Sequence, residues 1–297
     1  MTLQHRNFRL WIHVVTLTLL TALATSAAEI RVANFNLYNY LVTNRMVDGV
    51  YRKNYPKPEN EKKLLRDMIR RVDPDVLALQ EMGDESFLRE LQNDLKAEGL
   101  DYPHAVLMSG ADTVRHTAVL AKIPFVATHQ YDNLSFKHFG KKRFVKRGLL
   151  ETVFETNGQT WSLFVLHLKS RRTSWEMDPQ SFYYRLGEAT VCSKQIQKRY
   201  ASNPQALYLV AGDFNATQGS PILQQFDTFT TRVPTYDDNG ETWTYYYARE
   251  NVYESVDFLL ASPNLFERVK GKKGMIENKP KVKVVSDHRM IYLDLEF

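Results

Sequence analysis

Short apolar segments dominate the hydrophobic pattern of this chain and predict many strands. Residues 30–37 alternate apolar and polar side chains, which is typical of a half-buried strand. Residues 76–79 and 207–211 are continuous apolar runs of strand length, which indicates strands buried on both faces. Similar patterns predict further strands at residues 102–108, 117–121, 125–131, 148–155, 160–168, 242–247, 255–260, 282–285 and 290–297.

Three segments have the pattern of helices. In residues 59–72, apolar side chains recur at helical spacing and form one face of an amphipathic helix. Residues 86–97 form a second predicted helix, and residues 181–200 a longer third one. Strands are numerous, several are paired as hairpins, and helices lie between them. The pattern therefore predicts an α/β (α+β) fold in which two sheets pack face to face with helices outside them.

The N-terminal segment has the pattern of an export signal. His5, Arg6 and Arg9 give a positive start, residues 10–24 are apolar, and Ala27 and Ala28 are small residues suited to cleavage. We therefore expect residues 1–28 to be a signal peptide removed near Ala28, which leaves residues 29–297 as a single exported (periplasmic or secreted) domain. The alternative is an uncleaved membrane anchor, and in either case the body of the protein would lie outside the cytoplasm.

Composition narrows the kinds of site that this chain can contain. Its single cysteine, Cys192, excludes an internal disulfide and a cysteine-rich metal centre. Cys192 falls within the predicted helix 181–200, and we interpret it as a core thiol. A hydrophobic content of 43% is enough for a sizeable core, and the net charge of +5 is compatible with an anionic substrate.

Polar side chains recur where apolar strands end. One such residue alone is explained as a turn former or a helix cap. Several at once indicate a site, because open α/β sheets hold their sites at the carboxyl ends of strands. The residues are Asn36, Glu81, His167, Asp213, Asn215, Asp287 and His288.

The segments around these residues carry a resemblance to a known family. The chain contains, in this order, NFNLYN, LALQEM, VLHLKS, AGDFNAT, SVDFLLAS and VSDHRM. Together they resemble the endonuclease/exonuclease/phosphatase superfamily, which includes deoxyribonuclease-like enzymes, abasic-site endonucleases, inositol polyphosphate phosphatases and bacterial sphingomyelinases. The resemblance implies a four-layer sandwich with two mixed β-sheets and helices on the outer sides. It also implies metal-dependent hydrolysis of phosphate esters.

Hydrolysis of a phosphate ester needs a positive charge beside the anionic phosphate, and a hard divalent cation with oxygen ligands supplies it. The resemblance places Glu81 and Asn36 at the metal, with Asp287 as a further direct or water-mediated ligand. The lack of a cysteine cluster and the few candidate histidines favour Mg²⁺, with Mn²⁺ or Ca²⁺ as alternatives, over zinc.

The same resemblance implies roles for the acid–base residues. His288 is the general base or a hydrogen-bond partner of the scissile phosphate, since histidine titrates near neutral pH. Asp257 orients His288 and stabilises its charged form. Asp213 and Asn215 position the attacking water and a phosphate oxygen, and Asp213 is the alternative base. His167 contacts the phosphate or protonates the leaving oxygen.

The resemblance departs from deoxyribonuclease-like members at one position. There an acidic residue pairs with the histidine that matches His167, whereas this sequence places Arg115 or His116 at that position. Phosphate binding by His167 is therefore favoured over protonation of the leaving oxygen. Two basic residues adjoin strands that lead to the site, and we expect Arg147 and Lys169 to bind the substrate.

These observations predict an exported, metal-dependent phosphoesterase whose substrate is a phosphodiester. DNA or RNA is the first candidate substrate. The alternative substrates are phosphomonoesters, inositol phosphates and phospholipid head groups of the sphingomyelin type. A binding module without turnover is disfavoured, because the predicted metal ligands, the water-positioning pair and the His–Asp pair are all present. The sequence implies no stable protein partner, and it implies contact with a membrane only through an uncleaved N-terminal segment.

Overall fold

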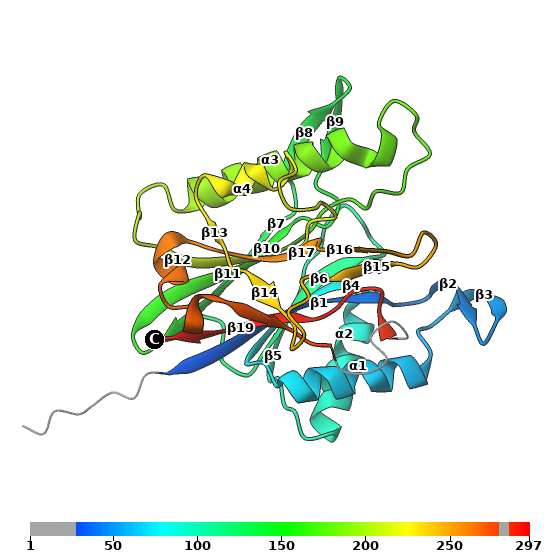
Figure 1. The fold of residues 1–297 in the computed structure, drawn as a ribbon, viewed down its shortest axis with the longest axis horizontal. Helices are drawn as coiled ribbons and strands as arrows, with labels where there is room; N and C mark the ends of the chain where they lie inside the picture. Colours follow the sequence, from blue (N-terminus) through cyan, green and yellow to red (C-terminus); the bar gives the residue numbers. More distant parts are fainter. Residues whose placement is uncertain (1–27, 279–284) are drawn as a thin grey trace, which may run out of the picture.

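The computed structural model describes residues 28–278 and 285–297 (Figure 1). All but the last residue of the predicted signal peptide, and most of the predicted strand 282–285, lie outside the described residues. Of the helices in the described part, none combines the length and the apolar character needed to cross a membrane.

Two mixed sheets form the centre of the described structure. The first contains seven strands, in the order β14 (Thr235–Tyr236), β18 (Gly274–Ile276), β19 (Ile291–Glu296), β1 (Glu29–Tyr40), β4 (Val76–Met82), β6 (His116–Ala121) and β5 (His104–Leu107). The second contains six, in the order β13 (Thr231–Arg232), β17 (Asp257–Ala261), β12 (Leu207–Asp213), β11 (Gln159–His167), β10 (Leu149–Thr156) and β7 (Ala127–Tyr131). The central pair of each sheet is parallel, β1 with β4 and β11 with β12, and the first sheet has a second parallel pair at its edge, β14 with β18.

Helices cover the outer face of each sheet (Figure 1). Val32 and Leu163 belong to an apolar cluster between the two sheets. Leu65 and Leu91 belong to a second cluster under the first sheet, and Ile196 to a third over the second sheet. The order helix, sheet, sheet, helix confirms the predicted four-layer sandwich. The helices are α1 (Glu59–Val72), α2 (Glu85–Ala97), α3 (Phe182–Arg199), α4 (Gln224–Asp227) and α5 (Pro263–Phe266), with 3₁₀ turns at Pro179–Ser181 and Lys270–Lys272.

Local sequence sets the bounds of the first two helices. The backbone at Asp73 is left-handed, with φ of 51°, and its N–H bonds the carbonyl of Ile69, which ends α1 where the sequence predicted. The Asp84 carboxylate accepts the backbone N–H of Ser86 at 2.9 Å and caps α2. These two caps therefore set the ends of the segment that contains strand β4.

Two hairpins differ from the sequence expectation, which took residues 38–58 and 137–147 as irregular. In a third hairpin only the second strand, Val252–Glu254, was not predicted, because residues 242–247 were expected to form a strand. Every residue of β3 is exposed, so no alternation of apolar and polar positions reveals it. The turn signal was present as Asp48-Gly49, where both residues have positive φ. The hairpins are β2 (Thr43–Val47) with β3 (Val50–Tyr55), β8 (Ser135–His138) with β9 (Lys141–Phe144), and β15 (Tyr245–Tyr247) with β16 (Val252–Glu254).

Strand register brings polar side chains of the second sheet to one edge. His167 at the end of β11 lies opposite Asp213 at the end of the parallel strand β12. Asp213 in turn lies opposite Asp257, the first residue of the antiparallel strand β17. In the first sheet, Asn36 of β1 lies opposite Gln80, one residue before Glu81, on the parallel strand β4. In both sheets, candidate functional residues therefore lie near the carboxyl ends of the central strands.

Candidate active site

The two sheets meet at a direct hydrogen bond between candidate residues. The Asn36 side-chain amide of β1 donates to the Asp213 carboxylate of β12 at 3.0 Å. The two residues are 177 positions apart in the chain. The predicted convergence of distant strand ends is therefore present in the structure, and the Asp213 carboxylate lies at its centre.

Asp213 is surrounded by hydrogen-bond donors and two imidazoles. Asn215, in the left-handed region at φ 49°, donates its backbone N–H at 2.8 Å and its side-chain N–H at 3.1 Å. The Nε2 atoms of His167 and His288 lie 3.5 and 3.7 Å from Asp213 Oδ2. Burial raises the pKa of the Asp213 carboxyl, while the charge of His288 opposes that rise. A group placed between these two rings could donate a proton to the Asp213 carboxylate or be oriented by it.

His288 and Asp257 form the predicted pair. Nδ1 of His288 lies 2.8 Å from Oδ2 of Asp257, and both side chains are buried. Burial alone would lower the pKa of His288, but the carboxylates of Asp257 and Asp213 outweigh it and raise the pKa well above its usual value. The Ser286 hydroxyl accepts the backbone N–H of His288 at 3.0 Å. The pair leaves Nε2 of His288 directed toward the cluster around Asp213.

Oxygen ligands collect on the other side of Asn36. Glu81 has left-handed backbone geometry, with φ of 58°, and its carboxylate accepts the backbone N–H of Asn39 at 2.8 Å. Burial, opposed by His288 and assisted by the negative charge of Glu81, raises the pKa of Asp287 to about 6. Among the described residues, Oδ1 of Asp287 has no hydrogen-bond partner. Two neighbouring carboxylates and an amide oxygen are a donor set that fits a hard divalent cation.

A second group of possible ligands is Asp213, Asp257 and His288, whose ligand atoms lie within 4.8 Å of one another. The nitrogen of His288 nearest Asp257 already shares a proton with that carboxylate. The geometry therefore favours an acid–base role for this trio, and it favours Glu81, Asn36 and Asp287 for the cation.

His167 has a different environment from His288. Burial lowers its pKa well below the usual value, and the positive charges of Arg147, His288 and Arg115 lower it further. Its Nδ1 atom has no hydrogen-bond partner among the described residues. The sequence predicted an arginine or a histidine where related enzymes have an acid, and the structure has Arg115 near the ring. His167 is thus a neutral ring suited to binding phosphate.

The two predicted substrate-binding residues lie beside His167 but differ in whether their hydrogen-bond donors are available to a substrate. Arg147 is buried, and its Nε lies 3.2 Å from the Asp112 carboxylate. The ammonium group of Lys169 donates hydrogen bonds to Ser170 and to the carbonyl of Arg172, so it is directed into its own loop. Of the two residues, Arg147 is therefore the one that keeps a donor, Nη1, without a hydrogen-bond partner among the described residues.

Sequence reasoning missed residues that hold the site in shape. Ser286 donates its hydroxyl to the carbonyl of Asn36 at 2.8 Å, and so connects the two motifs that carry Asn36 and His288. Asn39 fixes Glu81 through its backbone N–H. Both residues lie inside segments that carry the family resemblance. Their place in these motifs was therefore the sequence feature that could have identified them.

Fold and site together define a class of protein, the α/β sandwich hydrolases that cleave phosphate esters with a divalent metal. A model described as "Endonuclease/Exonuclease/phosphatase family" matches residues 33–288, and the chain belongs to this family. The resemblance inferred from the sequence is thereby confirmed. The protein is a metal-dependent phosphoesterase, and the roles of its individual residues stay predictions.

Solved structures support the same fold at low sequence identity. A Staphylococcus aureus beta toxin mutant with bound magnesium ions has a TM-score of 0.62 and 16% identity, covering 90% of this chain and 99% of that one. An endonuclease/exonuclease/phosphatase family protein from Leptotrichia buccalis has a TM-score of 0.62 and 16% identity, covering 90% and 100%. Truncated Caenorhabditis elegans TDP2 has a TM-score of 0.58 and 18% identity, covering 91% and 98%. Among curated protein sequences, none matches the chain significantly.

Proposed function

We propose that this protein is an exported phosphodiesterase that hydrolyses nucleic acid. The single observation that carries the chemistry is the buried cluster in which Asp213 joins Asn36, His167 and His288, with Asp257 behind His288. Such a cluster of buried polar groups is costly to fold, and a catalytic role explains why the chain contains it.

In the proposed reaction, His288 in its deprotonated form removes a proton from the attacking water through Nε2, so the raised pKa of the ring sets the pH above which this step occurs. Asp257 holds the ring by its hydrogen bond to Nδ1 and stabilises the charge that the ring gains. Asp213 orients the water, and it is the alternative base. Asn215 holds Asp213 in place through its backbone and side-chain N–H groups. His167 donates to an oxygen of the phosphate, which stabilises the negative charge that grows as the water attacks.

Glu81, Asn36 and Asp287 would hold the cation, and we propose Mg²⁺ because the donors are oxygens. When bound, such an ion neutralises the phosphate and stabilises the developing oxyanion. The magnesium-bound beta toxin structure supports this choice by similarity of fold. Oδ1 of Asp287, which accepts no hydrogen bond from a described residue, supports it from this chain's own geometry.

Nucleic acid is the proposed substrate because basic groups border the site. Arg147 adjoins His167, and the exposed strand β9, which precedes Arg147 in the chain, carries Lys141, Lys142 and Arg143. Cationic side chains of this kind bind a phosphate backbone with salt-dependent affinity. Export is proposed from the sequence pattern of residues 1–28 alone.

The test is hydrolysis of bis(p-nitrophenyl) phosphate by the purified protein, with Mg²⁺, Mn²⁺ or Ca²⁺ and with a chelator. We expect turnover with a divalent cation and none in the chelator; full activity in the chelator would refute the metal-dependent reaction. A panel of DNA, RNA, sphingomyelin, inositol phosphates and mononucleotides then identifies the substrate. Cleavage of a polymer should weaken steeply with salt, whereas preference for sphingomyelin or a phosphomonoester would refute the nucleic-acid assignment.

A further inference from the structure

The side of the site next to His167 is unusually positive. Arg115, Arg147 and Lys169 come from three separate segments, and each lowers the pKa of the His167 ring. A cluster of like charges is unfavourable without an anion to compensate it. Besides Asp213, whose Oδ2 lies 3.5 Å from Nε2 of His167, the carboxylates of Asp112 and Glu188 lie in this region. The bonds of these last two decide whether the arginines are already neutralised.

Asp112 neutralises Arg147 only in part. Its Oδ2 lies 3.2 Å from Nε of Arg147, but Nε and Nη1 of Arg147 have no well-aligned hydrogen bond to any described residue. The other oxygen, Oδ1, accepts the backbone N–H groups of Val114 and Arg115 at 3.0 and 3.2 Å. Arg147 is only 6% exposed, and a guanidinium so deeply buried normally has its donors bonded. Nε of Arg147 has its ion pair with Asp112, but Nη1 has no hydrogen bond to a described residue, and this donor points to an anion as the missing partner.

Glu188 does not supply that partner. Its two oxygens accept the backbone N–H groups of Lys146 and Lys169 at 2.9 and 2.6 Å. Burial raises the pKa of Glu188, which reduces the negative charge it presents to its neighbours. Glu188 therefore fixes the two segments that flank His167 and forms no hydrogen bond to Arg147.

Arg115 connects this positive region to the proposed metal ligands. Its Nε donates to the side-chain oxygen of Asn39 at 2.9 Å, and the backbone N–H of Asn39 bonds Glu81. The guanidinium is thus held between the Glu81 side of the site and His167, while no bond to its Nη atoms is found among the described residues. Its position suits an anion that lies next to the reacting phosphate.

We propose that Arg115 and Arg147 form a second anion-binding subsite beside His167, which holds a phosphate adjoining the scissile phosphate. This inference rests on the proposed function and narrows its substrate class. The protein would prefer esters that carry a neighbouring phosphate, as oligonucleotides do. It would reject choline phosphodiesters, because a quaternary ammonium beside two guanidinium groups is repelled.

The test compares substrates that differ only in the second phosphate. Thymidine 3′-(p-nitrophenyl phosphate) is assayed with and without a 5′-phosphate, and thymidine 5′-(p-nitrophenyl phosphate) with and without a 3′-phosphate. We expect kcat/KM for the substrate with the second phosphate to exceed kcat/KM for the substrate without it. The ratio should reach about 10 or more for one of the two isomers, which is the scale of one charge-assisted hydrogen bond. Arg115→Gln and Arg147→Gln should each lower this ratio toward 1.

Arg89→Gln is the matched control. Arg89 lies on α2, is well exposed and pairs with Glu85, so its loss changes the net charge equally without touching the subsite. The control should keep the wild-type ratio. A wild-type ratio near 1 for both isomers would overturn the proposal, as would a wild-type ratio retained in both arginine variants.

A binding measurement separates this inference from the proposed reaction. In a chelator, thymidine 3′,5′-bisphosphate and thymidine 5′-phosphate are titrated into the full chain, and affinity is followed by calorimetry. We expect the bisphosphate to bind about tenfold more tightly, and Arg115→Gln to remove the difference. Equal affinities for the two ligands would contradict the subsite even in a protein that hydrolyses phosphate esters.

Discussion

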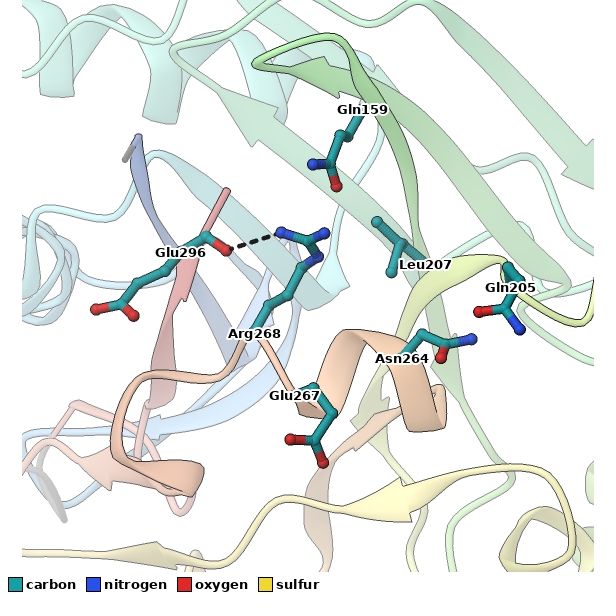
Figure 2. Close-up of a pocket in the computed structure, with 7 residues that line it drawn as sticks. All are labelled: Gln159, Gln205, Leu207, Asn264, Glu267, Arg268 and Glu296. Carbon is teal, nitrogen blue, oxygen red and sulfur yellow. Dashed lines mark hydrogen bonds between the residues drawn. The ribbon is translucent and has the colours of Figure 1, made fainter. Parts of the chain in front are cut away.

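The two ends of the central strands have opposite characters. At one end, Asp213, Asp257 and His288 are buried, with His288 hydrogen-bonded to Asp257 and its Nε2 atom 3.7 Å from Oδ2 of Asp213. At the other end lies a hollow of about 550 Å³, where β11 and β12 begin and β19 ends. Figure 2 shows its lining, in which the Arg268 guanidinium donates to the carbonyl of Glu296 at 3.4 Å.

The hollow has space but no arrangement of groups for chemistry. None of its seven lining residues is buried, and Glu267 pairs with Lys272 at 2.9 Å rather than with a group across the hollow. The candidate site has the reverse properties, because its charged groups are shielded from water and several of their atoms lack partners. Function in this fold is thus indicated by costly buried polar groups, and open volume alone does not indicate it.

The largest effect should come from the centre of the buried cluster. His288→Ala and Asp213→Ala should each lower kcat on bis(p-nitrophenyl) phosphate by about 100-fold or more, the scale of lost acid–base and electrostatic catalysis. Circular dichroism would establish that both variants are folded. Turnover at the wild-type level in either variant would remove that residue from the mechanism.

A smaller effect is expected at the oxygen ligands. Glu81→Gln and Asp287→Asn keep the shape of each side chain but remove a negative charge, so the Mg²⁺ concentration for half-maximal activity should rise about tenfold. Thermal stabilisation by Mg²⁺ should weaken in parallel, because a ligand stabilises the folded state in proportion to its affinity. If both variants required the same Mg²⁺ concentration as the wild-type protein, the cation would have to be assigned to other ligands.

The sequence predicted the contrast between the two ends only in part. Apolar runs and the residues that follow them identified the strand ends, and motif order identified which side chains matter. The contact between Asn36 and Asp213 was not predictable from spacing, because it depends on how two separate sheets pack. The positive φ of Asn39 and Glu81 was equally hidden, since neither residue is a glycine.

The buried ion pair of Arg289 and Asp237 tests stability near the site. Each side chain is 1% exposed, and the Asp237 carboxylate lies 2.5 Å from Nη2 of Arg289. Arg289→Met leaves the aspartate buried without its partner, so the free energy of unfolding should fall by about 3 kcal/mol. Urea denaturation measures the loss. Adding Asp237→Leu should recover part of it, and a double variant no more stable than the single one would refute this explanation.

The same pair predicts a dependence on acid. Burial works against ionisation of Asp237, but Arg289 and two backbone amides outweigh it and lower its pKa from 3.8 to about 2. A carboxyl with a lowered pKa contributes stability above its unfolded pKa, and this contribution is lost as the pH falls from about 4 to about 2. Asp237→Asn should therefore show a flatter loss of stability across that window in urea titrations. A slope equal to that of the wild-type protein would contradict the prediction.

The smallest effect is expected at the hollow. The double variant Gln205→Ala/Arg268→Ala removes polar side chains from its lining without exposing buried atoms, so hydrolysis should change less than twofold. The free energy of unfolding should change by no more than about 0.5 kcal/mol for each substitution, as is usual at exposed positions. The measurement uses the substrate and metal that give the wild-type protein its highest turnover. A tenfold loss of kcat/KM in this variant would show that the far end of the sheets takes part in the reaction, and open volume would then be as good a guide to function here as buried charge.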